Sequence, residues 1–406
     1  MFRCDRVFRL LCVLLLASAA LAQVTKAAEQ GDDSTCVVRN CMQQFVDQGE
    51  LAGAVAVVGR HDRILSYEAV GVRNLDTKHP MTKDTLFRIA SMTKPVTAIG
   101  IMLLVDEGRL SIDDEVEKHL PEFRGQMLVV NRTKESVTLK KPARKITIRD
   151  LLTHTSGLPG LHGIPGLADL YAKRDRTLAQ AVMAISQRPL EFEPGSRWAY
   201  CNLGIDTLGR VIEVVSGQSY ESFLQKRIFE PLGMVDTTFY PSWQQRDRTA
   251  TIYDFKDGRL VAQADQRICP GENVCYPLPA GGLYSTGADL AKLYQTMLCH
   301  GAYQGKRLLT EESVQAMTSL QTGELVAGFV PGMGFGLGWG VVREQAGVTE
   351  MLSPGAFGHG GAFATQGWID PKQDLFVILL IQRLGLQPNG DASVVRRALQ
   401  EAAVAM

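Results

Sequence analysis

The chain has 406 residues, of which 45% are hydrophobic and 21% charged, so it is long enough to bury a large core. Its 43 basic residues balance its 43 acidic residues, which excludes the strongly basic surface typical of nucleic-acid-binding proteins. Beyond the N-terminal segment no apolar run is long enough to cross a bilayer, so we expect no stable membrane span in the mature chain.

The N-terminus has the three regions of a secretory signal peptide. Three arginines precede the apolar run LLCVLLLASAALA, which ends in an A-x-A cleavage pattern. A charged region followed by a short apolar region and small residues directs export and is then removed. We therefore predict a signal peptide over residues 1–22 and a mature chain that is secreted or periplasmic.

The predicted elements of the mature chain begin with a helix over 39–50. The runs AGAVAVVG and RILSYEAVG then follow, separated by a short polar turn, and predict a β-hairpin. Residues 124–145 are rich in lysine and arginine and predict an exposed excursion. Residues 146–250 are mostly helical in pattern. Near the C-terminus the fully apolar run LFVILLIQ predicts a central strand, and 391–405 predict a closing helix.

The first motif with chemical content is Ser91-Met92-Thr93-Lys94, at the head of the apolar segment PVTAIGIMLLV. This segment predicts a buried helix that begins close to Ser91, and the i, i+3 spacing places Ser91 and Lys94 on one helical face. A serine hydroxyl needs a base to become a nucleophile. A lysine held against an apolar core has a lowered pKa and can serve as that base.

The second motif is Tyr200-Cys201-Asn202, which lies between the turn at Pro194-Gly195 and an amphipathic helix. A loop-to-helix junction lets side chains face a cleft. A tyrosine near a lysine can have its phenolate form favoured and can then shuttle protons. Asn202 offers a donor and an acceptor to a substrate amide or ester, although a helix N-cap would also explain it.

The third motif is Gly358-His359-Gly360-Gly361. Small residues beside a histidine permit the backbone to approach a ligand closely. A strand that runs from about Ala362 would present its backbone N–H groups to an oxyanion.

The cysteines and histidines predict structure rather than a metal site. Cys269 and Cys275 bracket a short polar loop, and Cys36 and Cys41 are near neighbours, so each pair can form a local disulfide in an oxidising compartment. A helix through Cys36 and Cys41 would instead point the two thiols apart. Neither H-E-x-x-H nor C-x-x-C occurs, so we predict no metal and no cofactor.

The three motifs, in this order and with wide spacings, resemble those of the serine β-lactamase and penicillin-binding-protein superfamily, in its class C-like branch. The resemblance extends over nearly all of the mature chain and includes four further segments: LLTHTSGLP (151–159), EPLGM (230–234), AGGLYST (280–286) and GFGLGWG (334–340).

The resemblance implies an α+β fold, a sandwich of an antiparallel sheet flanked by helices with an inserted, mostly helical region. We accordingly expect one catalytic domain over 23–406. Its sheet would come from about 39–90 and 325–406, and its helical region from about 91–320. The active site would lie where the two parts meet.

The resemblance also implies roles for individual residues. Ser91 is then the nucleophile that forms an acyl-enzyme, and Lys94 deprotonates it or holds it in a network. Tyr200 would relay the proton to the leaving group and then activate the deacylating water. Whether Lys94 or Tyr200 is the true base is a question of coupled titration that the sequence leaves open.

The substrate would be held beside this group by four residues: Asn202, His359, Gly360 and Gly361. The implied oxyanion hole consists of the backbone N–H groups of Ser91 and Ala362. His154, within LLTHTSGL, is interpreted as a structural residue that orients a loop.

His359 is the departure that matters, because lactamases mostly carry Lys-Thr-Gly at this motif. A histidine is mostly neutral at pH 7 and anchors a carboxylate more weakly than a lysine. We therefore expect a carboxylic-ester hydrolase acting on a small-molecule ester or amide, with a D-amino-acid peptidase or amidase second and a β-lactamase third. A non-catalytic binding or sensor homologue would be expected to lose the serine, lysine or tyrosine, and all three are kept.

Overall fold

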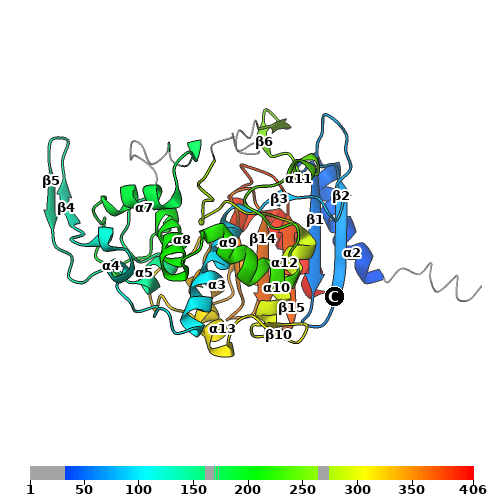
Figure 1. The fold of residues 1–406 in the computed structure, drawn as a ribbon. Helices are drawn as coiled ribbons and strands as arrows, with labels where there is room; N and C mark the ends of the chain where they lie inside the picture. The colour runs from blue at the N-terminus through cyan, green and yellow to red at the C-terminus, as the bar shows by residue number, and fades with distance from the viewer. Residues whose placement is uncertain (1–32, 161–168, 170, 172, 264–273) are drawn as a thin grey trace, which may run out of the picture.

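Strands from both ends of the chain form one seven-stranded antiparallel sheet (Figure 1). The computed structural model describes residues 33–160, 169, 171, 173–263 and 274–406, so the predicted signal peptide lies outside the described residues. The strand order is β11 (Met333–Phe335), β12 (Gly340–Val342), β13 (Phe357–Gly360), β14 (Gln366–Asp370), β15 (Leu375–Leu380), β1 (Gly53–Gly59) and β2 (Ile64–Gly71).

The predicted hairpin and the predicted central strand are both confirmed. β1 pairs with β2 on one side and with β15 on the other, where Val57 lies opposite Ile378. Every residue of β1 and β15 is buried. Strands covered on both faces have continuous apolar runs instead of alternation, which explains the AVAVV and LFVILL patterns.

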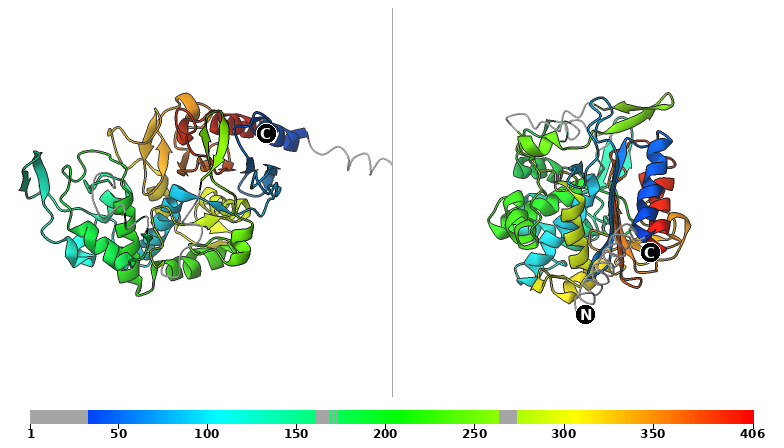
Figure 2. Two further views of the ribbon diagram at one scale, coloured as in Figure 1. Left: turned by 90° about the horizontal axis from the view of Figure 1, so that it is seen from above. Right: turned by 90° about the vertical axis from the view of Figure 1, so that its right-hand side faces the viewer.

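Helices cover both faces of the sheet (Figure 2). On one face α2 (Asp33–Asp47) packs on β1 and β2, α14 (Val394–Val404) packs on β15, and the two helices contact each other. On the other face α12 (Gly287–Leu298) packs against β1, β14 and β15. Alternate residues of β1 enter the two cores: Ala56 and Val58 pack with α2 and α14, whereas Val55 and Val57 join the larger core.

The larger core lies between the sheet and the region of the chain that connects β2 to β11. This region contains α3 (Thr93–Asp106), α4 (Val116–His119), α5 (Ile148–Leu152), α7 (Leu178–Ser186), α8 (Asn202–Ser216), α9 (Tyr220–Leu224), α10 (Glu230–Leu232), α11 (Trp243–Asp247) and α13 (Glu311–Thr318). This region also contains the single helical turns η1 (Ala90–Met92), η2 (Pro121–Phe123) and η3 (Gln225–Phe229), whereas η4 (Gly347–Thr349) and η5 (Gly390–Ala392) lie in the C-terminal part and contact α14. The predicted antiparallel sheet flanked by helices is confirmed.

Helix α3 is the centre of this region. Its residues from Thr93 to Leu104 are all buried, and it contacts α8, α9 and α13. A helix that is apolar on every side is stable only in the interior of a protein. Gly338, with φ of +79°, lets the β11–β12 turn approach α3, because a Cβ there would meet the Ala98 side chain. The predicted buried helix after Ser91 is thus confirmed.

Within the described residues, four two-stranded pairs lie outside the seven-stranded sheet. The lysine- and arginine-rich segment 124–145 is the exposed hairpin of β4 (Leu128–Arg132) and β5 (Val137–Lys140), which projects at the left of Figure 1. The others are β6 (Tyr253–Lys256) with β7 (Arg259–Ala262), β3 (Phe87–Arg88) with β8 (Tyr284–Ser285), and β9 (Ala302–Tyr303) with β10 (Lys306–Arg307).

Two sequence expectations are corrected at the N-terminal helix. It starts at Asp33, earlier than the predicted 39, and it contains both Cys36 and Cys41. Both thiols are free, so a disulfide between them is wrong and the helical alternative holds. The pairing of Cys275 with Cys269 falls outside the described residues, since 264–273 are not described. In the described part of the chain, none of the helices combines the length and apolar character that crossing a bilayer requires.

Candidate active site

Ser91 lies on a tight turn that directly precedes the N-terminus of α3. It occupies the middle of η1 and is only partly buried, while its neighbours Ala90 and Met92 are buried. Ala90 has φ of +47°, a left-handed conformation that an alanine rarely adopts. Such strain persists only where the surroundings impose it, and it concentrates at functional sites. The turn contacts β13 of the sheet as well as α3, so Ser91 lies where the sheet meets the helical region.

Lys94 is completely buried beside this hydroxyl. Its Nζ lies 3.0 Å from Ser91 Oγ and donates to the backbone oxygen of Ala280 at 2.6 Å. Burial away from water lowers the pKa of Lys94 to about 7, although the negative charge of Asp206 raises it in part. A sizeable share of the amine is therefore neutral at neutral pH and able to accept a proton, as the S-x-x-K spacing predicts.

Tyr200 faces both residues from the loop before α8. Its ring lies 4.7 Å from Lys94 Nζ, and its phenol forms a side-chain hydrogen bond with Ser91. The sequence suggested a favoured phenolate here, and this is wrong. Burial raises the pKa of Tyr200 above its ordinary value by more than the Ser91 bond lowers it, and Asp391 raises it further. The resting Tyr200 is a neutral phenol that can donate a proton.

His154 holds the backbone on both sides of Tyr200. Its Nδ1 accepts a hydrogen bond from the Cys201 N–H at 3.2 Å, and its carbonyl accepts one from Ala199 at 2.9 Å. The imidazole also packs on the Tyr200 ring, with centroids 4.5 Å apart. Burial and the nearby Lys94 lower the pKa of His154 well below its usual range, so the ring is neutral. These contacts match its interpretation as a structural residue.

Asn202 is the first residue of α8, but the N-cap is Cys201, which makes no side-chain capping bond. The alternative explanation of Asn202 as an N-cap is therefore wrong. Its Oδ1 is buried and has no hydrogen-bond partner among the described residues. A buried carbonyl oxygen without a partner is unfavourable, so this acceptor is available to a substrate N–H or to water.

His359 is 4% exposed and lies on β13, with its ring 6.1 Å from that of Tyr200. Its Nδ1 lies 2.7 Å from the Gly360 carbonyl, so Nδ1 carries the hydrogen and Nε2 is an acceptor without a described partner. Burial and the neighbouring Lys94 lower the pKa of His359 to about 3. The lowered pKa agrees with the expectation that this histidine is neutral, so position 359 lacks the cation that a lysine would supply.

The β13–β14 turn lies against the segment that precedes Ser91. Thr365 Oγ1 donates to the Ile89 carbonyl at 3.2 Å, and a Cβ on Gly361 would come within 2.5 Å of the same oxygen. Glycine is therefore required by this close approach. One detail of the prediction is wrong: β13 ends at Gly360, so Ala362 belongs to the turn and not to a strand.

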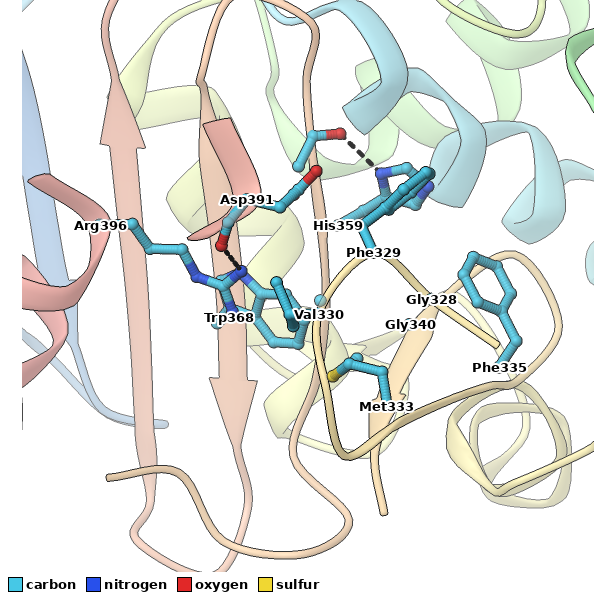
Figure 3. A pocket seen from close by; sticks show the side chains of 12 residues that line it. Gly328, Phe329, Val330, Met333, Phe335, Gly340, His359, Trp368, Asp391 and Arg396 are labelled. Atoms are coloured by element: carbon cyan, nitrogen blue, oxygen red, sulfur yellow. Dashed lines mark hydrogen bonds between the residues drawn. The ribbon is translucent and has the colours of Figure 1, made fainter. Parts of the chain in front are cut away.

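A small pocket of about 20 Å³, roughly the room that one water molecule needs, is lined in part by His359 (Figure 3). Its wall is mostly apolar, and it includes Phe329, Val330, Met333, Phe335 and Trp368. Phe329 is 45% exposed and stacks edge-on against both Tyr200 and Trp198, at 4.8 and 5.7 Å between centroids.

Asp391 and the buried Arg396 form the polar side of the same pocket. Arg396 Nη1 donates to the Asp391 backbone oxygen at 2.5 Å, and its guanidinium lies over the Trp368 ring. In the described ranges, no group of three or more His, Cys, Asp or Glu side chains is placed to hold a metal ion.

The side chains of Ser91, Lys94 and Tyr200 come from a 3₁₀ turn, a buried helix and a loop. Together they have the arrangement that a nucleophilic serine needs. A profile of the family described as Beta-lactamase matches residues 38–402. The chain belongs to this family. The resemblance inferred from the three motifs is therefore confirmed, as is the fold that it implies.

Two relatives and one solved structure place the chain within the family. Esterase EstB of Burkholderia gladioli is 31% identical over 360 residues, which cover 83% of this chain and 87% of that protein. The D-alanyl-D-alanine-carboxypeptidase/endopeptidase AmpH of Escherichia coli K12 is 27% identical over 379 residues, covering 92% and 89%. The structure of EstCE1, a hydrolase with promiscuous acyltransferase activity, superposes with a TM-score of 0.76 at 24% identity, covering 92% and 99%. At that identity the superposition shows the fold alone. The chain is a serine hydrolase of the β-lactamase family.

The sequence did not point to every residue that shapes the site. Phe329, Asp391 and Arg396 lie in segments without a motif, and only the folded chain brings them to His359. Asp206 was equally inconspicuous, because an aspartate in an amphipathic helix is normally expected on its solvated face. One signal was available: Asp206 falls among the apolar residues of α8, where a charge requires partners.

Proposed function

We propose that the protein is a carboxylic-ester hydrolase that acts through an acyl-enzyme on Ser91. The observation that carries this proposal is the contact of Ser91 with an amine poised to accept a proton and a phenol poised to donate one. Lys94 accepts the proton of Ser91 as Oγ attacks the ester carbonyl carbon. The developing oxyanion is held by the backbone N–H groups of Ser91 and Ala362.

The remaining steps use the same groups in turn. The tetrahedral intermediate collapses, the bond to the alcohol oxygen breaks, and Tyr200 protonates the leaving alkoxide. Lys94 returns its proton to Tyr200. A water molecule then attacks the acyl carbon while Lys94 takes one of its protons. The tetrahedral intermediate collapses, the bond between the acyl carbon and Ser91 Oγ breaks, and Lys94 gives its proton to Oγ as the carboxylic acid leaves. In this scheme the base is Lys94, since its pKa lies near neutrality and that of Tyr200 lies far above it.

The surroundings of His359 support an ester over a β-lactam. A neutral, buried imidazole supplies no charge for a carboxylate, whereas the aromatic wall of Phe329, Phe335 and Trp198 suits an apolar acyl or alcohol group. Esterase EstB is a relative that has this activity in its name.

A peptidase or amidase acting on D-amino-acid substrates is the second candidate. The free Oδ1 of Asn202 favours it, because this oxygen can accept an amide N–H that an ester lacks. The similarity to AmpH supports the same alternative.

The test compares kcat/KM of the chain without residues 1–22 on p-nitrophenyl acetate and butyrate, nitrocefin and D-alanyl p-nitroanilide. We expect the esters to be the best substrates and nitrocefin to be turned over little or not at all. Ser91→Ala should abolish hydrolysis and labelling by a fluorophosphonate while the circular dichroism spectrum stays unchanged. A preference for nitrocefin over both esters would reverse the ranking, and labelling that survives Ser91→Ala would remove Ser91 as the nucleophile.

We also propose that the protein is exported, on the strength of the charged and apolar N-terminal pattern alone. Expression of the full chain in a bacterial host, followed by N-terminal sequencing of the periplasmic fraction, should give a mature end after about residue 22. Recovery of the uncut chain in the cytoplasm would contradict export.

A further inference from the structure

The proposed mechanism leaves one buried carboxylate unused, and this carboxylate is linked to Lys94 through a single intervening residue. Asp206, on α8, is 0% exposed. Its Oδ1 accepts from the Ala280 N–H at 2.9 Å, and its Oδ2 accepts from the Tyr276 hydroxyl at 2.7 Å and from the Tyr171 hydroxyl. Each of these three groups donates a hydrogen bond, so the contacts fit an ionised carboxylate. Among the described residues Asp206 has no ion pair within 4.0 Å.

The Ala280 main chain connects this carboxylate to Lys94. Asp206 holds the N–H of Ala280, and the carbonyl of the same residue accepts from Lys94 Nζ at 2.6 Å. Thr97 fixes the adjoining peptide, because its Oγ1 donates to the Pro279 carbonyl at 2.8 Å. We propose that Asp206 is a positioning residue that aims the Lys94 amine at Ser91 through Ala280 and acts as its buried counter-charge. This inference rests on the proposed function.

The proposal explains why Lys94 is not driven to a still lower pKa. Burial disfavours its charged form, and the pKa of Lys94 is raised in part by Asp206 and by Cys201. Conversely Lys94 lowers the pKa of Asp206, which burial raises. The titratable groups facing this pair from the packed elements are Tyr200, Cys201, His154, His359, Tyr171, Tyr220 and Tyr276. Of these, burial keeps His154 and His359 neutral, and it raises the pKa of Cys201 to about 11.

Asp206→Asn removes the charge and keeps the size and an acceptor for Ala280. The pKa of Lys94 should then fall, since no anion remains to favour its charged form. In a plot of kcat/KM against pH, the limb that reflects the titration of Lys94 should move to lower pH by about one unit, which is a typical effect of a nearby opposite charge. The direction is the same whether the neutral amine or the ammonium is the active form, so the test does not depend on which group is the base.

The measurement is the pH profile of kcat/KM for p-nitrophenyl butyrate, between about pH 5 and about pH 9. Alongside it, the rate of fluorophosphonate labelling of Ser91 is followed over the same range. We compare the wild-type chain with Asp206→Asn, Tyr276→Phe and Thr207→Val. Tyr276→Phe keeps the carboxylate but removes a hydroxyl that neutralises part of its charge, so it should shift both limbs to higher pH, by a smaller amount. Thr207→Val, next to Asp206 on α8, removes the bond from its Oγ1 to the Leu203 carbonyl, so it should lower the melting temperature and leave the limbs in place.

Unmoved limbs in Asp206→Asn would overturn the inference, as would an equal movement in Thr207→Val, which would mean a general loosening. If Asp206→Asn does not fold, Tyr276→Phe decides, and unmoved limbs in that variant count against the inference. The labelling rate separates this inference from the proposed function. A chain that hydrolyses none of the esters but whose labelling limb moves would refute the esterase and keep the role of Asp206.

Discussion

Replacing Lys94 by methionine should abolish catalysis and should also change how stability depends on pH. The pKa of Lys94 falls from 10.5 to about 7 on folding. Between these two values the unfolded chain binds more protons than the folded one, so the wild-type free energy of unfolding rises with pH across this window. Below it, the folded state carries the full cost of a buried ammonium, about 4 to 5 kcal/mol for a difference of this size.

Methionine has a similar length and no charge, so Lys94→Met lacks this pH dependence. Its loss of the bond to the Ala280 carbonyl costs about 1–3 kcal/mol, and that cost is independent of pH. The anion of Asp206 is also left without its counter-charge, which destabilises the variant more as the pH rises. When the pH is raised from about 6 to about 9, the free energy of unfolding of the wild-type chain should therefore rise by about 2.5 kcal/mol or more relative to that of the variant.

The assay is urea unfolding, followed by tryptophan fluorescence, at both pH values. Thr97→Val serves as the control, since it changes a buried, uncharged side chain of the same helix and should show the same difference from the wild-type chain at both. If the difference between Lys94→Met and the wild-type chain is equal at the two pH values, or changes in the opposite direction, then Lys94 does not titrate near neutrality and cannot be the base.

Three further changes test other parts of the site. Gly361→Ala would place a Cβ within 2.5 Å of the Ile89 carbonyl and displace the turn beside the nucleophile, so kcat for p-nitrophenyl butyrate should fall about 10- to 100-fold; a change in KM alone would contradict this. His359→Lys should shift the kcat/KM ratio toward nitrocefin by about 1–3 kcal/mol, and an unchanged ratio would show that this side chain does not face a substrate carboxylate. Phe329→Ala removes an aromatic contact of Tyr200, so KM for p-nitrophenyl butyrate should rise about 3- to 10-fold, with less effect on the acetate; equal effects on both would argue against an apolar subsite.

The chemistry of the site could be predicted where residues are neighbours in sequence. Ser91 and Lys94 are one helical turn apart, and an apolar segment follows them, so their contact and the lowered pKa of Lys94 are consequences of local geometry and burial. The hairpin of β1 and β2 and the strand β15 were equally visible, because their apolar runs and turn residues are local signals.

The sequence failed where an outcome depends on competing effects from distant segments. Proximity to Lys94 suggested a phenolate at Tyr200, but burial opposes the charged form more strongly, and burial is set by the whole fold. The strand expected to run from about Ala362 begins only at Gln366, because β13 ends at Gly360 and a turn whose Gly361 lies close to the Ile89 carbonyl separates the two strands.

The sequence by itself therefore determined the family and the fold class, and it pointed to the three side chains that we propose to react, since these depend on residue types at short spacings and on hydrophobic pattern. Only the tertiary structure decided the charge states, the apolar wall at Phe329 and the link from Asp206 through Ala280 to Lys94. Asp206 and Ala280 are far apart in the chain, and hydrogen bonds and desolvation act across space, so no local pattern encodes them.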